Sequence, residues 1–135
     1  MEKGIFGTRG FTDKVLKMLN AISAVKHSLG NYHRFEINAG TLVEISKIIP
    51  SKNLKTDKQN DGPYLYRFVE LAKKIPRTRF DGYVIDKSRD DERVTIDGVI
   101  FPEDDITEVK RTLVCRKHPD ENDPESFGMR RWWWD

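Results

Sequence analysis

The sequence predicts an α+β domain in which three or four helices pack against a small antiparallel sheet. Apolar residues recur at helical spacing near the start of the chain, and two β-rich segments form a predicted hairpin over residues 80–101. With 135 residues, the chain has the usual size of one domain and can bury a core without disulfides or metals. We expect one domain over residues 1–120 and a C-terminal tail over residues 121–135.

The first predicted element is a helix over residues 12–29. Thr12 is suited to cap its start, and Gly30 is a natural stop after its last turn. Apolar residues follow each other three or four positions apart along this segment: Val15, Leu16, Leu19, Ile22 and Val25. This spacing predicts that one face of the helix packs against the core.

The middle of the chain divides into four further segments. Residues 32–38 alternate between polar and apolar side chains, which indicates a short strand. Residues 41–49 begin with a capping-box pattern and predict a short helix, although their β-branched content leaves a strand as the alternative. Residues 50–62 are polar and predict a loop. Residues 63–74 start with a proline and predict a second amphipathic helix.

The second half of the chain opens with the predicted hairpin. Residues 80–87 and 93–101 are β-rich, and the polar turn between them reads SRDDE. Residues 104–117 fit either a helix, which begins with a capping-box pattern at Asp105, or a third strand. We favour the helix.

Composition limits the compartment and the chemistry. The single cysteine, Cys115, cannot form a disulfide within the chain, and no apolar run approaches the ~20 residues needed to span a bilayer. The start of the chain lacks the apolar segment of a secretory signal. We therefore expect a cytoplasmic protein without a membrane span. The three histidines show no metal-ligand spacing, so we expect neither a metal nor another cofactor.

Charge is distributed unevenly along the chain. Residues 41–80 contain nine Lys or Arg against four Asp or Glu, whereas residues 81–135 contain nine against fifteen. If the fold keeps the two parts apart, the basic surface attracts polyanions and the acidic surface attracts basic partners. The alternative is that the two parts neutralise each other across the fold.

The predicted order of helix, strand, helix, helix and hairpin resembles that of winged-helix DNA-binding domains. The resemblance lies in the element order and not in a sequence motif. It implies that the third helix enters the major groove and that the hairpin contacts the backbone. Lys and Arg side chains that neutralise phosphates release counterions and so provide affinity. The predicted nucleic-acid contacts are Lys47, Lys52, Lys55, Lys58, Arg67, Lys73, Lys74, Arg77 and Arg79.

A second pattern lies in the acidic part of the chain. Asp97, followed by Glu108 and Lys110, resembles the core motif of PD-(D/E)xK nucleases. The resemblance implies that Asp97 and Glu108 bind Mg²⁺, that Lys110 positions the attacking water, and that Glu70 adds a further acid. The helix predicted over residues 104–117 directs Glu108 elsewhere, so this hypothesis is an alternative.

The C-terminal tail contains three consecutive tryptophans, which cannot all face the same way on one helix or strand. Trp and Arg are enriched in binding hot spots. The tail therefore either folds back onto the core, docks a partner protein, stacks on bases or lies at a membrane surface. The predicted docking residues are Phe127, Arg130, Arg131, Trp132, Trp133 and Trp134.

The function that these patterns favour is non-enzymatic binding of nucleic acid through the basic residues between positions 47 and 79, with no catalytic residue. An interaction or inhibitor module that docks through the tail and the acidic part is the first alternative. The metal-dependent nuclease is the second. The patterns do not identify a partner or distinguish DNA from RNA.

Overall fold

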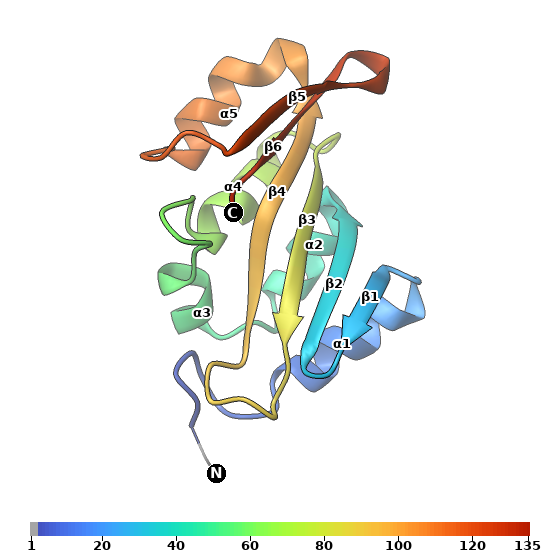
Figure 1. Cartoon of the computed structure of the whole chain (residues 1–135), viewed down its shortest axis with the longest axis vertical. Coiled ribbons are helices and arrows are strands. Elements are labelled where there is room, and N and C mark those ends of the chain that lie inside the picture. The colour runs from blue at the N-terminus through green and yellow to red at the C-terminus, as the bar shows by residue number, and fades with distance from the viewer. Residues whose placement is uncertain (1–2) are drawn as a thin grey trace.

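Six antiparallel strands form one sheet, with helices packed against one of its faces (Figure 1). The computed structural model describes residues 3–135. The strand order across the sheet is β1-β2-β3-β4-β6-β5, and all neighbouring strands are antiparallel. The strands are β1 Val25–Leu29, β2 Tyr32–Asn38, β3 Arg79–Ile85, β4 Arg93–Pro102, β5 Glu121–Glu125 and β6 Met129–Trp133. The predicted α+β class is confirmed.

The helices are short and lie mainly behind the sheet as it is drawn in Figure 1, which leaves the near face open. They are α1 Thr12–Ala21, α2 Ala39–Ser46, α3 Ser51–Thr56, α4 Leu65–Lys74 and α5 Ile106–Leu113, with 3₁₀ turns η1 Glu103–Asp105 and η2 Ser126–Gly128. No helix within residues 3–135 is long and apolar enough to cross a membrane. The amphipathic pattern of α4 turns Leu65, Phe68 and Leu71 towards the sheet and leaves its polar residues outside.

The predicted C-terminal tail belongs to the sheet. Residues 121–135 form the β5–β6 hairpin, and β6 pairs with β4 from Gly98 to Pro102. Alternation along the strand turns Trp132 and Trp134 into the core, where their exposed fractions are 3% and 0%, and leaves Trp133 partly exposed on the other side. The tail therefore folds back, which was one of the predicted alternatives.

Aromatic rings connect this hairpin to the rest of the core. The Phe68 ring of α4 lies edge-to-face with Trp134 at 5.9 Å and with Phe80 of β3 at 6.1 Å between centroids. Trp132 lies edge-to-face with Phe101 at 4.8 Å. Such pairs add to the stability that burial of the rings already provides. Trp132 and Trp134 thus lie within the hydrophobic core.

Strand β4 is longer than the part of it that β6 pairs with. Beyond Gly98, the Trp134 amide donates to the Asp97 carbonyl at 2.8 Å. Further along, the Asn53 side chain of α3 donates to the Val94 carbonyl at 3.0 Å and accepts from the Val94 amide at 2.9 Å. A buried backbone group without a partner costs roughly 1–3 kcal/mol, so this side chain replaces a missing strand.

The prediction of one long helix over residues 12–29 is wrong beyond Ala21. Ser23 has a left-handed backbone (φ 55°), and Val25–Leu29 then pairs with β2. Gly30 (φ 60°) lies in the turn of this β-hairpin and not at the end of a helix. Pairing with a neighbouring strand outweighs the helical spacing of the apolar residues, because local propensity is a weak constraint.

The start of α1 is capped from the other half of the sequence. Phe11 is the N-cap residue, and its side chain makes no capping bond. Glu92, in the β3–β4 turn, accepts bonds from the Gly10 amide at 2.7 Å, the Thr12 amide at 3.1 Å and the Thr12 hydroxyl. The prediction that Thr12 caps the helix is wrong, because a buried carboxylate satisfies these free amides instead.

The remaining segments mostly follow the predictions. The helix predicted over 41–49 begins earlier, because the Asn38 side chain accepts from the Thr41 amide at 2.8 Å and caps the helix at Ala39. The loop predicted over 50–62 contains helix α3. The strand over 32–38 and the helix within 104–117 are confirmed.

The structure does not confirm a winged-helix arrangement. The hairpin of β3 and β4 lies in the middle of the sheet, with β2 on one side and β6 on the other. A wing has to project so that its turn can reach the nucleic-acid backbone. Here the turn of the hairpin instead holds Glu92 against α1.

Replacing the last tryptophan tests whether the C-terminal residues belong to the core. We expect Trp134→Ala to lower the free energy of unfolding by about 3–5 kcal/mol in urea denaturation, because a fully buried indole leaves a cavity. The control is Phe127→Ala, which changes stability by less than about 0.5 kcal/mol since that ring is 96% exposed. Equal stability of the two variants contradicts this assignment.

Candidate nucleic-acid interface

A hollow of about 190 Å³ lies between the start of α4 and the end of α5. Two tyrosines and three cationic side chains line it, together with the apolar residues Pro63, Leu113 and Val114. The lining residues that matter here are Lys58, Tyr64, Tyr66, Arg67, Val114 and Arg116. Aromatic rings beside Lys and Arg are the combination that single-stranded nucleic acids bind.

The two tyrosine rings stack on each other, with their centroids 6.0 Å apart and their planes at 18°. Lys58 Nζ lies 5.0 Å from the Tyr64 ring centroid, and the Arg67 guanidinium lies 4.8 Å from that of Tyr66. Tyr64 is 38% exposed. Cations at these distances are attracted to the ring faces, which holds long mobile side chains beside the aromatic surface.

An adjoining hollow extends this surface towards α3. It measures about 460 Å³ and shares Tyr66 with the first hollow, and its other lining residues are Ser51, Leu54 and Lys55. Four cations line the two hollows, against the single carboxylate of Asp61: Lys55, Lys58, Arg67 and Arg116. Of these, Arg67 also lies 3.9 Å from Glu70. We call this combined surface the basic tyrosine face.

Packing against the core determines the path of the loop before α4. A Cβ atom on Gly62 would lie 2.9 Å from the Gln59 carbonyl oxygen and 3.1 Å from the Trp134 ring. Only glycine allows this approach, so the loop lies directly on the core tryptophan. Tyr64 then occupies the N-cap position of α4 and Tyr66 its outer side. The core thus positions both rings.

On the α5 side, Val114 has a left-handed backbone (φ 53°, ψ 58°) and is 49% exposed. This conformation is unfavourable for a β-branched residue and costs on the order of 1–3 kcal/mol. It ends α5 and leads the chain to Arg116 at the rim of the hollow. Backbone strain at a hollow is a feature of functional sites, and this observation is independent of the charges.

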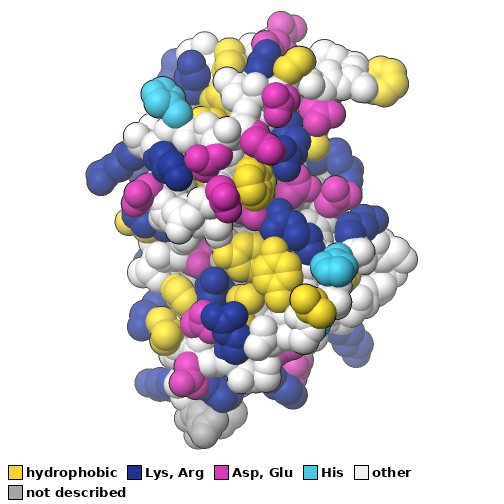
Figure 2. Space-filling view, viewed as in Figure 1, with side chains coloured by type: hydrophobic (Ala, Val, Ile, Leu, Met, Phe, Trp, Pro, Cys, Tyr) yellow, Lys and Arg dark blue, Asp and Glu magenta, His cyan; other side chains and the backbone are white. Residues whose placement is uncertain are grey.

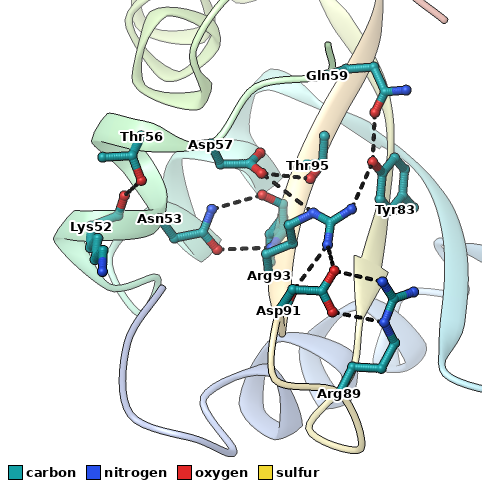
Figure 3. Close-up of polar contacts among 11 residues, drawn as sticks. Lys52, Asn53, Thr56, Asp57, Gln59, Tyr83, Arg89, Asp91, Arg93 and Thr95 are labelled. Carbon is teal, nitrogen blue, oxygen red and sulfur yellow. Dashed lines mark hydrogen bonds and ion pairs between the residues drawn. The ribbon is translucent and has the colours of Figure 1, made fainter. Parts of the chain in front are cut away.

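Polar side chains fasten the α3 segment to the sheet beneath this face (Figure 3). Besides the Asn53 contacts, the Thr95 hydroxyl donates to Asp57 Oδ1 at 3.1 Å, and the Tyr83 hydroxyl donates to Gln59 Oε1 at 2.6 Å. Arg93 Nε lies 3.6 Å from Asp57 Oδ1, and its Nη1 bonds Asp91 at 2.6 Å. This network fixes the segment that carries Lys55 and Lys58.

Asp57 is the unusual member of the network. Its side chain is buried, and its Oδ2 has no hydrogen-bond partner among the described residues. Burial raises the pKa of Asp57 from 3.8 to about 7, although the bond from Thr95 and the charge of Arg93 oppose the shift. The carboxyl group is therefore protonated in mildly acid solution and titrates near neutrality.

The structure brings together only some of the predicted nucleic-acid contacts. Lys55, Lys58 and Arg67 line the basic tyrosine face, and Lys52 lies one turn before Lys55 on α3. Lys73, Lys74, Arg77 and Arg79 follow at the opposite end of α4. Lys74 faces Glu108 at 3.5 Å, and Lys47 of α2 bonds Glu44 at 3.0 Å. The predicted set is therefore divided between the basic tyrosine face, the opposite end of α4 and the end of α2.

The open face of the sheet carries cations that are already paired. Figure 2 shows this face, on which Lys and Arg alternate with Asp and Glu around a central apolar patch. Arg34 makes a two-bond ion pair with Asp97, at 2.8 and 2.6 Å, and Arg131 bonds Glu121 at 2.6 Å. Paired cations have little remaining attraction for phosphate. The basic tyrosine face is therefore the better surface for a polyanion.

The residues of the predicted nuclease motif do not share a site. Asp97 bonds Arg34 on the open face, whereas Glu108 lies on α5, where it contacts Lys74 and Arg111. Lys110 is exposed on the same helix, and Glu70 lies beside Arg67. Within residues 3–135, no group of three or more His, Cys, Asp or Glu is arranged to hold a metal ion.

Cys115 is half buried, and burial raises the pKa of its thiol to about 11 despite the charge of Lys110. A thiol with such a pKa is protonated at neutral pH, whereas a nucleophile has to be a thiolate. These properties are typical of a cysteine that packs as a small apolar residue.

The predicted docking residues differ in their surroundings. Trp132 and Trp134 are buried and Trp133 is partly buried, so these rings contribute to the stability of the fold. Arg130 bonds Glu103 at 2.5 Å, and Arg131 bonds Glu121. Phe127 alone in this set is a large apolar side chain in full contact with solvent.

Sequence reasoning missed Tyr64, Tyr66 and Arg116. Tyr64 lies within the segment that predicts an amphipathic helix, and nothing near Arg116 indicates that the end of α5 meets the start of α4. The available signal was the segment from Lys58 to Arg67, in which a cation at each end flanks two closely spaced tyrosines. Comparison of the chain with protein-family models, curated proteins and solved structures found no match.

The buried carboxyl group of Asp57 makes stability depend on pH. Because folding raises its pKa from 3.8 to about 7, the folded state holds a proton that the unfolded state has lost between these values. Its contribution is thus complete below about pH 4 and is lost as the pH rises to about 7. We expect Asp57→Asn to match the parent in stability at low pH and to exceed it at pH 8 by up to about 4 kcal/mol.

Chemical denaturation at several pH values checks this expectation. Other carboxyl groups titrate equally in both proteins, so the difference between the two isolates Asp57. A constant difference between pH 4 and pH 8 contradicts a buried carboxyl group with a raised pKa.

Proposed function

We propose that the protein binds single-stranded nucleic acid on the basic tyrosine face. The observation that carries the proposal is the pair of stacked tyrosines, each with a cation beside its ring, at a hollow whose rim is basic. The tyrosines stack on bases, while Lys55, Lys58, Arg67 and Arg116 neutralise the phosphates. Stacking contributes about 1–3 kcal/mol for each base.

A single strand suits this face better than a duplex. The bases of a duplex are stacked on each other, so their ring faces are inaccessible to Tyr64 and Tyr66. An unpaired base exposes both ring faces and can enter a hollow. Lys58 and Arg67 have long side chains, and they can move from the tyrosine rings to the adjacent phosphates when a base stacks.

Binding of a fluorescent homopolymer of about 12 nucleotides, measured by anisotropy, tests the proposal. We expect affinity to fall steeply between about 50 and 200 mM salt, because each neutralised phosphate releases counterions. A Tyr64→Ala, Tyr66→Ala double variant should bind roughly tenfold to a hundredfold more weakly with the same salt dependence. A Lys58→Ala, Arg67→Ala double variant should also show a shallower salt dependence.

The matched control is the Lys73→Ala, Lys74→Ala double variant, which removes the same charge at the opposite end of α4. Its affinity should stay within a few-fold of the parent. Absence of binding at about 50 mM salt rules the proposal out. An equal loss in the control shows that net charge, and not this face, determines binding. A duplex that binds as tightly as the single strand contradicts the role of the tyrosines.

A further inference from the structure

The β5–β6 hairpin ends in an aromatic side chain without packing partners. Phe127 is 96% exposed, and its backbone is left-handed (φ 60°, ψ 36°). A left-handed backbone is unfavourable for phenylalanine, and Gly or Asn is the usual choice at such a position. Neither the solvent exposure of the ring nor the left-handed backbone favours phenylalanine at this position. A contact between this ring and another molecule accounts for the choice of residue.

The hairpin holds this ring on a rigid support. Asn122 Oδ1 accepts from Trp132 Nε1 at 3.0 Å and from Arg130 Nη1 at 2.7 Å, which ties β5 to β6. Arg130 also bonds Glu103 of η1. Trp132 itself is part of the core. A side chain presented by a rigid element loses less entropy on binding than one on a mobile loop.

Around the ring, the hairpin is acidic. All five residues of β5 are exposed, and three of them are carboxylates: Glu121, Asp123 and Glu125. The two cations of β6 are engaged, since Arg130 bonds Glu103 and Arg131 bonds Glu121. Glu125 therefore remains available to a basic partner, as does Asp123, whose carboxylate makes no hydrogen bond or close ion pair among the described residues although its charge also acts on Arg130. The hairpin fits an apolar hollow with a basic rim.

Among the described residues, two open hollows with mainly apolar linings lie outside the hairpin, which itself helps to line a further hollow through Asn122 and Trp132. One is part of the basic tyrosine face and is lined by Ser51, Leu54, Lys55 and Tyr66. The other, of about 450 Å³, is lined by Met18, Ile22, Asn38, Gly40, Thr41 and Glu44. Only the first has a cation in its lining, and Lys52 lies one turn from it on the same helix. Charge thus selects the first hollow for the acidic hairpin.

We propose that the β5–β6 hairpin of one copy docks on a second copy, with Phe127 in the hollow of Leu54 and Tyr66 and with Asp123 and Glu125 facing Lys52 and Lys55. Figure 1 shows the turn of the hairpin at the upper right and α3 at the lower left, so the turn does not reach the hollow of its own chain. The two surfaces differ, so each copy keeps one free hairpin and one free hollow. Association of this kind grows with concentration into short open chains.

Sedimentation velocity over a concentration series, at low salt and without nucleic acid, tests this proposal. We expect the average mass to rise with concentration and the rise to weaken with added salt, because the charges are exposed. Phe127→Ala should weaken association about tenfold or more. The matched control is Ile22→Ala, since Ile22 is a 56% exposed apolar residue in the other hollow. It should leave association unchanged.

A mixing experiment identifies the two surfaces. Lys55→Glu damages the hollow but leaves the hairpin intact, whereas Asp123→Lys damages the hairpin but leaves the hollow intact. Each variant alone should stay monomeric at concentrations where the parent associates. An equimolar mixture should form pairs, because one variant supplies a working hairpin and the other a working hollow. All substituted side chains are exposed or partly exposed, and circular dichroism verifies that each variant is folded.

Three results overturn the proposal. They are a parent that stays monomeric over the whole series, equal effects of Phe127→Ala and Ile22→Ala, and a mixture that does not associate. Since no oligonucleotide is present, these results are independent of the proposed nucleic-acid binding. If both proposals hold, an oligonucleotide should dissociate the assembled copies, because Tyr66 and Lys55 belong to both contacts.

Discussion

The outer edge of β4 determines how the second half of the chain is arranged. This strand is ten residues long, and its buried backbone groups need partners on both sides. β3 satisfies one side. On the other side, β6 pairs with the end of the strand, the Trp134 amide bonds Asp97, and the Asn53 side chain bonds Val94. The C-terminal hairpin and α3 are thus placed by the same requirement.

The same edge of β4 also positions the elements that carry the basic tyrosine face. α3 and the loop after it follow β4 because Asn53 and Asp57 attach to Val94 and Thr95. The loop then crosses Trp134, where only Gly62 leaves enough room, and α4 begins. The face is therefore supported by the end of the chain as well as by its middle. Polar side chains, together with Leu54 packed against the core, hold the surface element that carries its lysines.

The basic and acidic residues that are separate along the sequence pair with each other in the folded structure. Many carboxylates of residues 81–135 are used within the fold: Glu92 caps α1, Asp97 holds Arg34, and Glu108 contacts Lys74. The two parts of the chain therefore neutralise each other over much of the surface, as one of the predicted alternatives states. Exceptions include Lys55 and Lys58 beside the tyrosines and Asp123 and Glu125 of β5, and the two proposals rest on these residues.

The sequence alone determined the fold class, the central hairpin and the helices whose apolar spacing is unambiguous, because these depend on local periodicity. It also showed that the basic and acidic residues are segregated. The tertiary structure decided what depends on contacts between distant residues. Pairing with β2 turned the end of the first predicted helix into β1, and pairing with β4 drew the tryptophans into the core. Only the packing of α5 beside α4 brought Arg116 to the tyrosines, since no spacing along the chain encodes such a contact.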